Sequence, residues 1–272
     1  MSLYRSERIS PHIIRIRDIA GVACYLIEGT QRACLLDTCC GYGNLREYVK
    51  TLTPKVPFVI LTHGHYDHTG SAALFEEVYM SHLDLPVLQR HSKERSYYLG
   101  EDKKNIPSLK GFDSESLNPL LTKVPLPLCD NDMFDLGGIT IRMISVPGHT
   151  PGMMCALIPE EKVIFFGDAC GMNVLLHDQF SSCVSEYRNS LMKLKDHEKE
   201  YDRIYRNHGT CTNDKKLLDN VLECCNLILA KEDDQCPVEM YGRTLYAAKS
   251  AVDGIRIDGK DGNIIYAPEK RK

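Results

Sequence analysis

The sequence lacks an apolar run long enough to cross a membrane. A membrane-spanning helix needs about 20 consecutive apolar residues, and no stretch of the 272-residue chain approaches that length. Residues 1–8 also lack the apolar segment that is typical of a signal peptide. We therefore expect a cytoplasmic protein that has no membrane partner.

An excess of basic charge is also absent. Lysine and arginine number 33 against 37 aspartates and glutamates, for a net charge of −4. The most obvious charged run, residues 101–104, is mixed in sign. Domains that bind nucleic acid usually carry a strongly basic surface, so we expect no nucleic-acid partner.

None of the 12 cysteines belongs to a Cys-x-x-Cys motif. Two adjacent pairs occur, at 39–40 and 224–225, while Cys24, Cys34 and Cys155 lie in strand-like stretches. A disulfide framework is typical of short exported chains, and this chain is neither short nor expected to be exported. We therefore expect reduced thiols that mostly act as small hydrophobic side chains.

The hydrophobic content of 43% and the charged content of 26% are ordinary for a globular protein. Strand-like and helical periodicities alternate along the chain, which predicts a mixed α/β fold. Strands are expected at 11–17, 22–28, 33–38, 57–61, 78–82, 133–136, 139–146, 153–158, 162–166 and 201–205. Helices are expected at 45–52, 71–77, 84–99, 182–197 and 213–231.

The most informative stretch is a His-x-His-x-Asp-His motif at residues 63–68, directly after a short apolar run. Such a run predicts a buried strand, and open α/β folds place their binding crevices at the carboxyl ends of strands. Residues two apart in an extended segment point the same way, so His63 and His65 can bind one metal ion. Asp67 and His68 follow as the chain turns and can bind a second ion.

Neutral imidazole suits zinc, iron or nickel, and a carboxylate adds an anionic oxygen ligand. The alternative interpretation of the motif is a solvated loop that happens to be rich in histidine.

The motif resembles the signature of the metallo-β-lactamase superfamily. Later segments resemble that family's remaining ligand motifs in the same order: a histidine loop at 146–152, a strand end with a bridging aspartate at 165–168, and a last histidine loop at 206–209. The likeness extends from about Ile13 to His208. Each later motif would be weak alone, since its key residue could be an ordinary turn or cap residue, and the ordered set carries the specificity.

The resemblance implies a four-layer αβ/βα sandwich of two mixed sheets flanked by helices. We expect one metallo-β-lactamase-like domain over residues 1–272. Residues 100–128 have weak periodicity and four prolines. We therefore interpret residues 83–128 as an insertion that caps the site or, alternatively, as a surface loop without a role. Residues 232–272 are expected to form an appended small sheet or a dimerisation element, so a homodimer remains open.

The resemblance also implies a site for two divalent metal ions, with zinc favoured and iron or manganese as alternatives. The implied ligands are His63, His65 and His149 for one ion, and Asp67, His68 and His208 for the other. Asp168 would bridge the two ions. Asp67 is also the catalytic candidate, because it could accept a hydrogen bond from the nucleophilic water.

Asp37 resembles the aspartate that ends a strand in this family, and we expect it to orient a ligating imidazole. Its alternative role is a plain cap or turn residue. Lower-ranked candidates for the substrate pocket are Tyr66, His82, Tyr97, Tyr98, Asn173 and His177. The remaining histidines, at 12, 91 and 197, are expected to be surface or core residues.

Departures from the residue patterns of several subfamilies reduce the number of reactions that we expect. Asp168 stands where class B1 and B2 β-lactamases have cysteine, and Gly171 stands where lactonases tend to have tyrosine. His65 is present where diiron flavoproteins have glutamate. The remaining resemblance is to glyoxalase II-like hydrolases, which implies hydrolysis of a small ester, thioester or related acyl substrate. The alternatives are a phosphodiesterase of the same fold and a non-hydrolytic, iron-dependent oxidoreductase or sensor.

Overall fold

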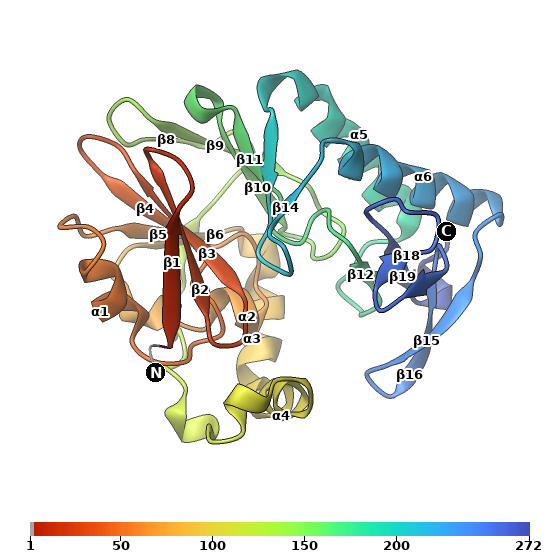
Figure 1. Cartoon of the computed structure of the whole chain (residues 1–272), viewed down its shortest axis with the longest axis horizontal. Coiled ribbons are helices and arrows are strands. Elements are labelled where there is room, and N and C mark those ends of the chain that lie inside the picture. Colours follow the sequence, from red (N-terminus) through yellow and green to blue (C-terminus); the bar gives the residue numbers. More distant parts are fainter. Residues whose placement is uncertain (1–2) are drawn as a thin grey trace. The chain divides into compact units, whose positions relative to one another are not determined.

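A computed structural model describes residues 3–272 (Figure 1). The chain forms two compact units, which we call the first and the second unit. The first consists of Met1–Ile141 with Asn207–Cys211, and the second of Arg142–Arg206 with Thr212–Lys272. In the described part of the chain, no helix has the length and apolar character that spanning a bilayer requires.

The first unit contains a seven-stranded sheet in which the strand order follows the sequence, β1-β2-β3-β4-β5-β6-β7. Pairing is antiparallel from β1 to β4 and parallel from β4 to β7, so the sheet is mixed. All residues of β4 and β5 are buried. The strands are β1 (Tyr4–Arg8), β2 (Ile13–Asp18), β3 (Ala23–Glu28), β4 (Ala33–Leu36), β5 (Phe58–Ile60), β6 (Val78–Met80) and β7 (Leu126–Pro127).

The helices of this unit are short. They are α1 (Leu45–Lys50), α2 (Tyr66–Thr69), α3 (Leu85–Lys93) and α4 (Arg95–Asn105). The side chain of Asn44 caps α1 by accepting a hydrogen bond from the Glu47 amide, 3.1 Å away. The core combines apolar residues of the sheet, such as Ile16 and Leu35, with Val49 of α1 and Leu88 of α3. The short strand β8 (Met133–Asp135) also lies in this unit.

Within the second unit, the strands of the main sheet follow the order β14-β13-β11-β10-β9, and a smaller sheet has the order β12-β19-β16-β15. The main-sheet strands are β9 (Thr140–Ser145), β10 (Met154–Ile158), β11 (Val163–Phe165), β13 (Arg203–Tyr205) and β14 (Thr212–Asn213). The smaller sheet comprises β12 (Val174–Leu176), β15 (Cys236–Met240), β16 (Arg243–Ala247) and β19 (Ile264–Tyr266), and β17 (Ala251–Val252) pairs with β18 (Ile255–Arg256).

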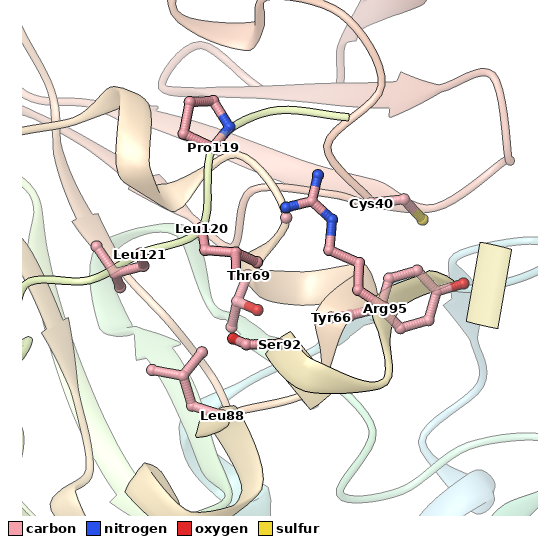
Figure 2. Close-up of a pocket in the computed structure, with 10 residues that line it drawn as sticks. Cys40, Tyr66, Thr69, Leu88, Ser92, Arg95, Pro119, Leu120 and Leu121 are labelled. Carbon is pink, nitrogen blue, oxygen red and sulfur yellow. The ribbon is translucent and has the colours of Figure 1, made fainter. Parts of the chain in front are cut away.

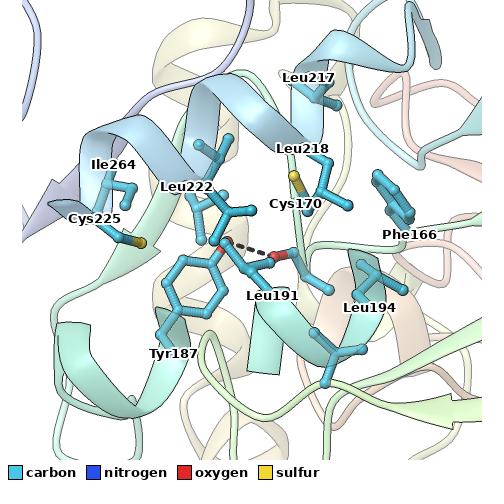
Figure 3. Packing of buried hydrophobic residues seen from close by; sticks show 14 of the residues in the cluster. Phe166, Cys170, Tyr187, Leu191, Leu194, Leu217, Leu218, Leu222, Cys225 and Ile264 are labelled. Atoms are coloured by element: carbon cyan, nitrogen blue, oxygen red, sulfur yellow. Dashed lines mark hydrogen bonds between the residues drawn. The ribbon is translucent and has the colours of Figure 1, made fainter. Parts of the chain in front are cut away.

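Two long helices, α5 (Val184–Asp196) and α6 (Lys216–Ala230), lie side by side in this unit (Figure 1). Figure 3 shows how their apolar faces meet around Tyr187, Leu191 and Leu222. The Tyr187 hydroxyl donates to the Ala169 carbonyl at 2.6 Å, which satisfies the phenol inside the core.

The mixed sheets with flanking helices confirm the predicted α/β class. Several local predictions were less accurate. The expected helix at 71–77 is only a single 3₁₀ turn, Ala72–Leu74, and the expected helix at 84–99 is two helices that extend to Asn105. Strand β1 was missed because only Tyr4 of its five residues is buried, so an edge strand of this kind leaves almost no apolar pattern.

Candidate metal centre

The His-x-His-x-Asp-His motif begins at the end of β5 and continues into the single turn α2. His65 is the extended residue immediately before that turn, with φ −71° and ψ 149°. His63 and His68 are buried, and their ring centroids are 4.1 Å apart. The His63 and His65 rings are 4.6 Å apart. The predicted strand-to-turn geometry is therefore present, and it gathers these imidazoles in one place.

Asp67, His68 and His208 present their ligand atoms to one point within the first unit. The Nε2 atoms of His68 and His208 are 3.2 Å apart. The Asp67 Oδ2 atom is 3.7 Å from Nε2 of His68 and 3.3 Å from Nε2 of His208. A tetrahedral ion with bonds of about 2.0–2.1 Å holds its ligand atoms about 3.3 Å apart, so these side chains fit a zinc-sized ion.

Asp37 lies beside the Nδ1 edge of the His68 ring, away from the ligand atoms, and is fully buried. Its Oδ1 accepts a hydrogen bond from the Thr62 amide at 2.7 Å. Its Oδ2 accepts from the Thr62 hydroxyl at 2.8 Å and from Nδ1 of His68 at 2.9 Å. The same Oδ2 accepts from the Asn207 side-chain amide at 2.9 Å. Asp37 has a φ of 62°, a conformation that aspartate and asparagine tolerate better than most residues.

The Asp37 contacts determine how the ligands are presented. Because Nδ1 of His68 donates its proton to the carboxylate, Nε2 carries the lone pair that a metal needs. The Thr62 hydroxyl, which donates to Asp37, lies 3.1 Å from Nδ1 of His63 and can accept its proton. Asn207 also donates to the Ala23 carbonyl at 2.7 Å, which ties the loop carrying His208 to β3.

A row of stacked rings extends from the motif into α3 and α4. The His65 ring stacks on His91 at 4.1 Å, His91 on Tyr98 at 4.5 Å, and Tyr98 on Tyr66 at 5.0 Å. Nδ1 of His91 also accepts from the Tyr66 amide at 3.4 Å. The Tyr66 hydroxyl donates to the Asp102 carboxylate in α4, and burial raises the pKa of Asp102.

His91 was expected to be an ordinary surface or core residue. It is buried, and its ring stacks on His65, a contact that was not expected. The signal was available in the spacing of α3, because Val87, Leu88 and His91 share the buried face of that helix.

The second unit carries the other two implied ligands, His149 and Asp168. Nδ1 of His149 lies 2.9 Å from the Leu175 carbonyl, so this nitrogen is the protonated one. Nε2 of the same ring is 3.7 Å from Oδ2 of Asp168. The Ser181 hydroxyl donates to the His149 backbone carbonyl at 3.1 Å. His149 is thus held in the tautomer in which Nε2 can bind a metal.

The remaining pocket candidates contact neighbours within their own units. Nε2 of His82 hydrogen-bonds with the Pro125 carbonyl at 2.9 Å, and the amide of Asn173 donates to Gly254 at 3.3 Å. The ring of His177 stacks on Tyr241 at 4.9 Å. Tyr97 is 49% exposed, and Tyr98 belongs to the ring row. A role for any of them in substrate binding stays a prediction.

The family model described as Metallo-beta-lactamase superfamily matches residues 17–202. The chain belongs to the metallo-β-lactamase superfamily. Its fold is therefore the αβ/βα sandwich of that superfamily, as the sequence predicted.

Proteins similar to this chain include an acyl-coenzyme A thioesterase, MBLAC2, from Gallus gallus. It is 25% identical over 180 residues, which cover 62% of this chain and 65% of the relative. The atrochrysone carboxyl ACP thioesterase dmxR1 from Cryptosporiopsis sp. is 26% identical over 220 residues, which cover 76% of this chain and 57% of that protein. The chain therefore spans less than two thirds of the length of these relatives.

Among solved structures, a metallo-beta-lactamase from Pontibacter korlensis aligns with a TM-score of 0.57. The sequence identity is 17%, and the alignment covers 82% of this chain and 99% of that protein. At this identity the likeness concerns the fold.

Proposed function

We propose that this protein is a hydrolase that uses two divalent metal ions to cleave a small thioester or ester. In this proposal His63, His65 and His149 would hold one ion, and Asp67, His68 and His208 the other. Asp168 would complete the set of residues that hold the metals. The observation that carries the proposal is the convergence of Asp67, His68 and His208, whose ligand atoms all lie within 4.8 Å of one another.

Three further observations support this proposal. The buried Asp37 holds His68 in the tautomer that can bind a metal, and the Leu175 carbonyl does the same for His149. The superfamily typically binds divalent metals. The relatives described above are named thioesterases, which favours a thioester within the substrate range that the glyoxalase II-like motifs imply.

Bound divalent ions would supply a water of lowered pKa and a Lewis acid for the substrate carbonyl. The side chains of this chain have distinct tasks around that chemistry. In this proposal the Asp67 carboxylate accepts a hydrogen bond from the attacking water and orients it toward the carbonyl carbon. Asp37 keeps the imidazole of His68 fixed while charge develops at the site. Attack by water also means that no serine or cysteine nucleophile is required.

The test is a panel of activated substrates assayed with metal-reconstituted protein. Hydrolysis of thioesters and esters is expected, with zinc as the first metal tried and iron and manganese in parallel. The His65→Ala variant should lose activity by more than about 100-fold, since even changes outside the ligand set of a metal site cost about 10–100-fold. His12→Ala is the matched control. His12 is a histidine that is not a ligand candidate, and its ring hydrogen-bonds with the Glu28 carbonyl.

Other results on the same panel would replace the proposal. Faster cleavage of a bis-aryl phosphate than of any thioester would indicate the phosphodiesterase alternative. Bound iron with oxygen consumption and no hydrolysis would indicate an oxidoreductase, and tight metal binding without any turnover would indicate a sensor. Equal turnover by His65→Ala and the unaltered protein would refute the metal site as the catalytic centre.

A further inference from the structure

A pocket lies beside the metal motif within the first unit (Figure 2). It is a small hollow, with a cavity volume of about 20 Å³, that opens to solvent. One wall is formed by Tyr66 and Thr69 of α2, the same turn that carries Asp67 and His68. The pocket and two of the proposed metal ligands therefore share one short element.

The pocket has an apolar lining and a single charge. Leu88, Pro119, Leu120 and Leu121 provide the apolar part. Among the described residues that line it, Arg95 is the only charged one. Figure 2 shows the Arg95 side chain extending across the pocket between Tyr66 and Pro119.

The guanidinium of Arg95 is half-buried and is not balanced by an acid. Within the described part of the chain, no carboxylate forms an ion pair with it, and burial lowers the pKa of Arg95. The Tyr66 hydroxyl, which also lines the pocket, donates its hydrogen bond to Asp102. A partly desolvated cation without a partner is costly, whereas an arginine fork bound to a carboxylate makes two charge-assisted hydrogen bonds.

We propose that Arg95 binds a carboxylate at the far end of the acyl group, so that the preferred substrates are thioesters of dicarboxylic acids. This inference rests on the proposed hydrolase function and adds the substrate class. A carboxylate attached to a short carbon chain matches one guanidinium beside leucine and proline side chains. The phosphates of a carrier such as coenzyme A carry several charges on polar groups, and one cation in an apolar pocket suits them less well.

The experiment compares three substrates: an adipoyl monothioester of N-acetylcysteamine, a neutral hexanoyl thioester of the same thiol, and hexanoyl-coenzyme A. The unaltered protein should prefer the adipoyl thioester to the neutral one. Arg95→Ala should reduce that preference about 10- to 100-fold, chiefly through KM, because hydrogen bonds to charged groups are worth about one to two orders of magnitude in binding. Arg95→Lys should restore part of it.

Arg46→Ala is the matched control, because Arg46 lies on α1, is 40% exposed and pairs with Glu76 at 3.6 Å. It should leave the preference unchanged. If Arg95→Ala slows the coenzyme A thioester and spares the adipoyl thioester, Arg95 contacts carrier phosphates and the proposal is wrong. An equal effect on all three substrates would also overturn it.

A binding measurement separates this inference from the catalytic one. Adipate, which is not a substrate, should bind the metal-reconstituted protein in calorimetry, and Arg95→Ala should weaken its binding about 10-fold or more. That result would stand even if no thioester were hydrolysed, in which case only the proposed function fails. If neutral thioesters are hydrolysed and Arg95→Ala binds adipate as tightly as the unaltered protein, the proposed function stands. The carboxylate site at Arg95 is then refuted. Unfolding curves of each variant exclude a loss of folding as the cause.

Discussion

Replacing Asp37 by asparagine tests the link between the buried carboxylate and the metal ligands. The substitution preserves shape, and asparagine tolerates the φ of 62° at this position. What changes is the Oδ2 position, which accepts from the Thr62 hydroxyl, His68 and Asn207. An amide nitrogen placed there would face three donors. If the side-chain amide were instead rotated by half a turn, its nitrogen would take the Oδ1 position and face the Thr62 backbone amide.

Either orientation leaves at least one buried donor without an acceptor, and each such donor costs about 1–3 kcal/mol. The metal-free variant should therefore unfold more easily by at least that amount. An asparagine nitrogen that donates to Nδ1 of His68 would also favour the tautomer protonated at Nε2, which cannot bind a metal. Metal affinity should accordingly fall about 10- to 100-fold, the range measured when partners of metal-binding histidines are changed.

The assay is competition for zinc against a chromophoric chelator, with urea unfolding of the metal-free protein as the second readout. Asp18→Asn is the matched control. Asp18 is also a buried aspartate, and it accepts from the backbone amides of Val22 and Cys40 at 3.0 Å without touching a histidine. The control should lose stability and keep its zinc affinity. Equal zinc affinity in Asp37→Asn and the unaltered protein would refute the positioning role of Asp37.

Other parts of the molecule yield further predictions. Gly70→Ala should destabilise the motif by about 3 kcal/mol or more, since the new Cβ would lie 2.2 Å from the Cys40 carbonyl carbon; retention of normal metal content and stability would contradict this. Leu191→Ala, in the fully buried face of α5, should cost about 2–5 kcal/mol in urea unfolding, and a loss below 1 kcal/mol would speak against tight packing. The hydrogen bond from Lys249 lowers the pKa of Asp234 to about 2. Because that value is below the usual one, the stabilisation is present above about pH 4 and is lost as the pH falls toward 2. Asp234→Asn should thus flatten the stability profile in that window by under about 1 kcal/mol, the scale of an exposed pair, and an unchanged profile would contradict the assigned partner.

The metal motif could be predicted from sequence because its information is local. Alternation in an extended segment places His63 and His65 together, and the following turn adds Asp67 and His68 within six positions. The preceding apolar run is the fully buried β5. His208 was added by resemblance to an ordered motif set, and its approach to His68 depends on Asn207 contacting residues about 170–184 positions earlier. No periodicity in the sequence contains that contact.

The segment 83–128 was only partly predictable from the sequence. A single helix was expected at 84–99 and an irregular cap or a loop without a role after it, whereas the structure has two helices, Leu85–Lys93 and Arg95–Asn105. The ring row from His65 through His91 to Tyr98 depends on how α3 and α4 pack against α2. The spacing of α3 could indicate that His91 faces inward, but its stacking on His65 and the half-burial of Arg95 depend on tertiary packing that no local pattern contains. A covering role for this segment remains a proposal.

The most direct test of the metal-dependent hydrolase is elemental analysis of the reconstituted and dialysed protein, performed together with thioester turnover on the same samples. A pair of divalent ions per chain is expected, with activity that disappears on chelation and returns with metal. It also predicts that Asp67→Asn loses bound metal and turnover together. Thioester hydrolysis that persists in chelated, metal-free protein would contradict the account.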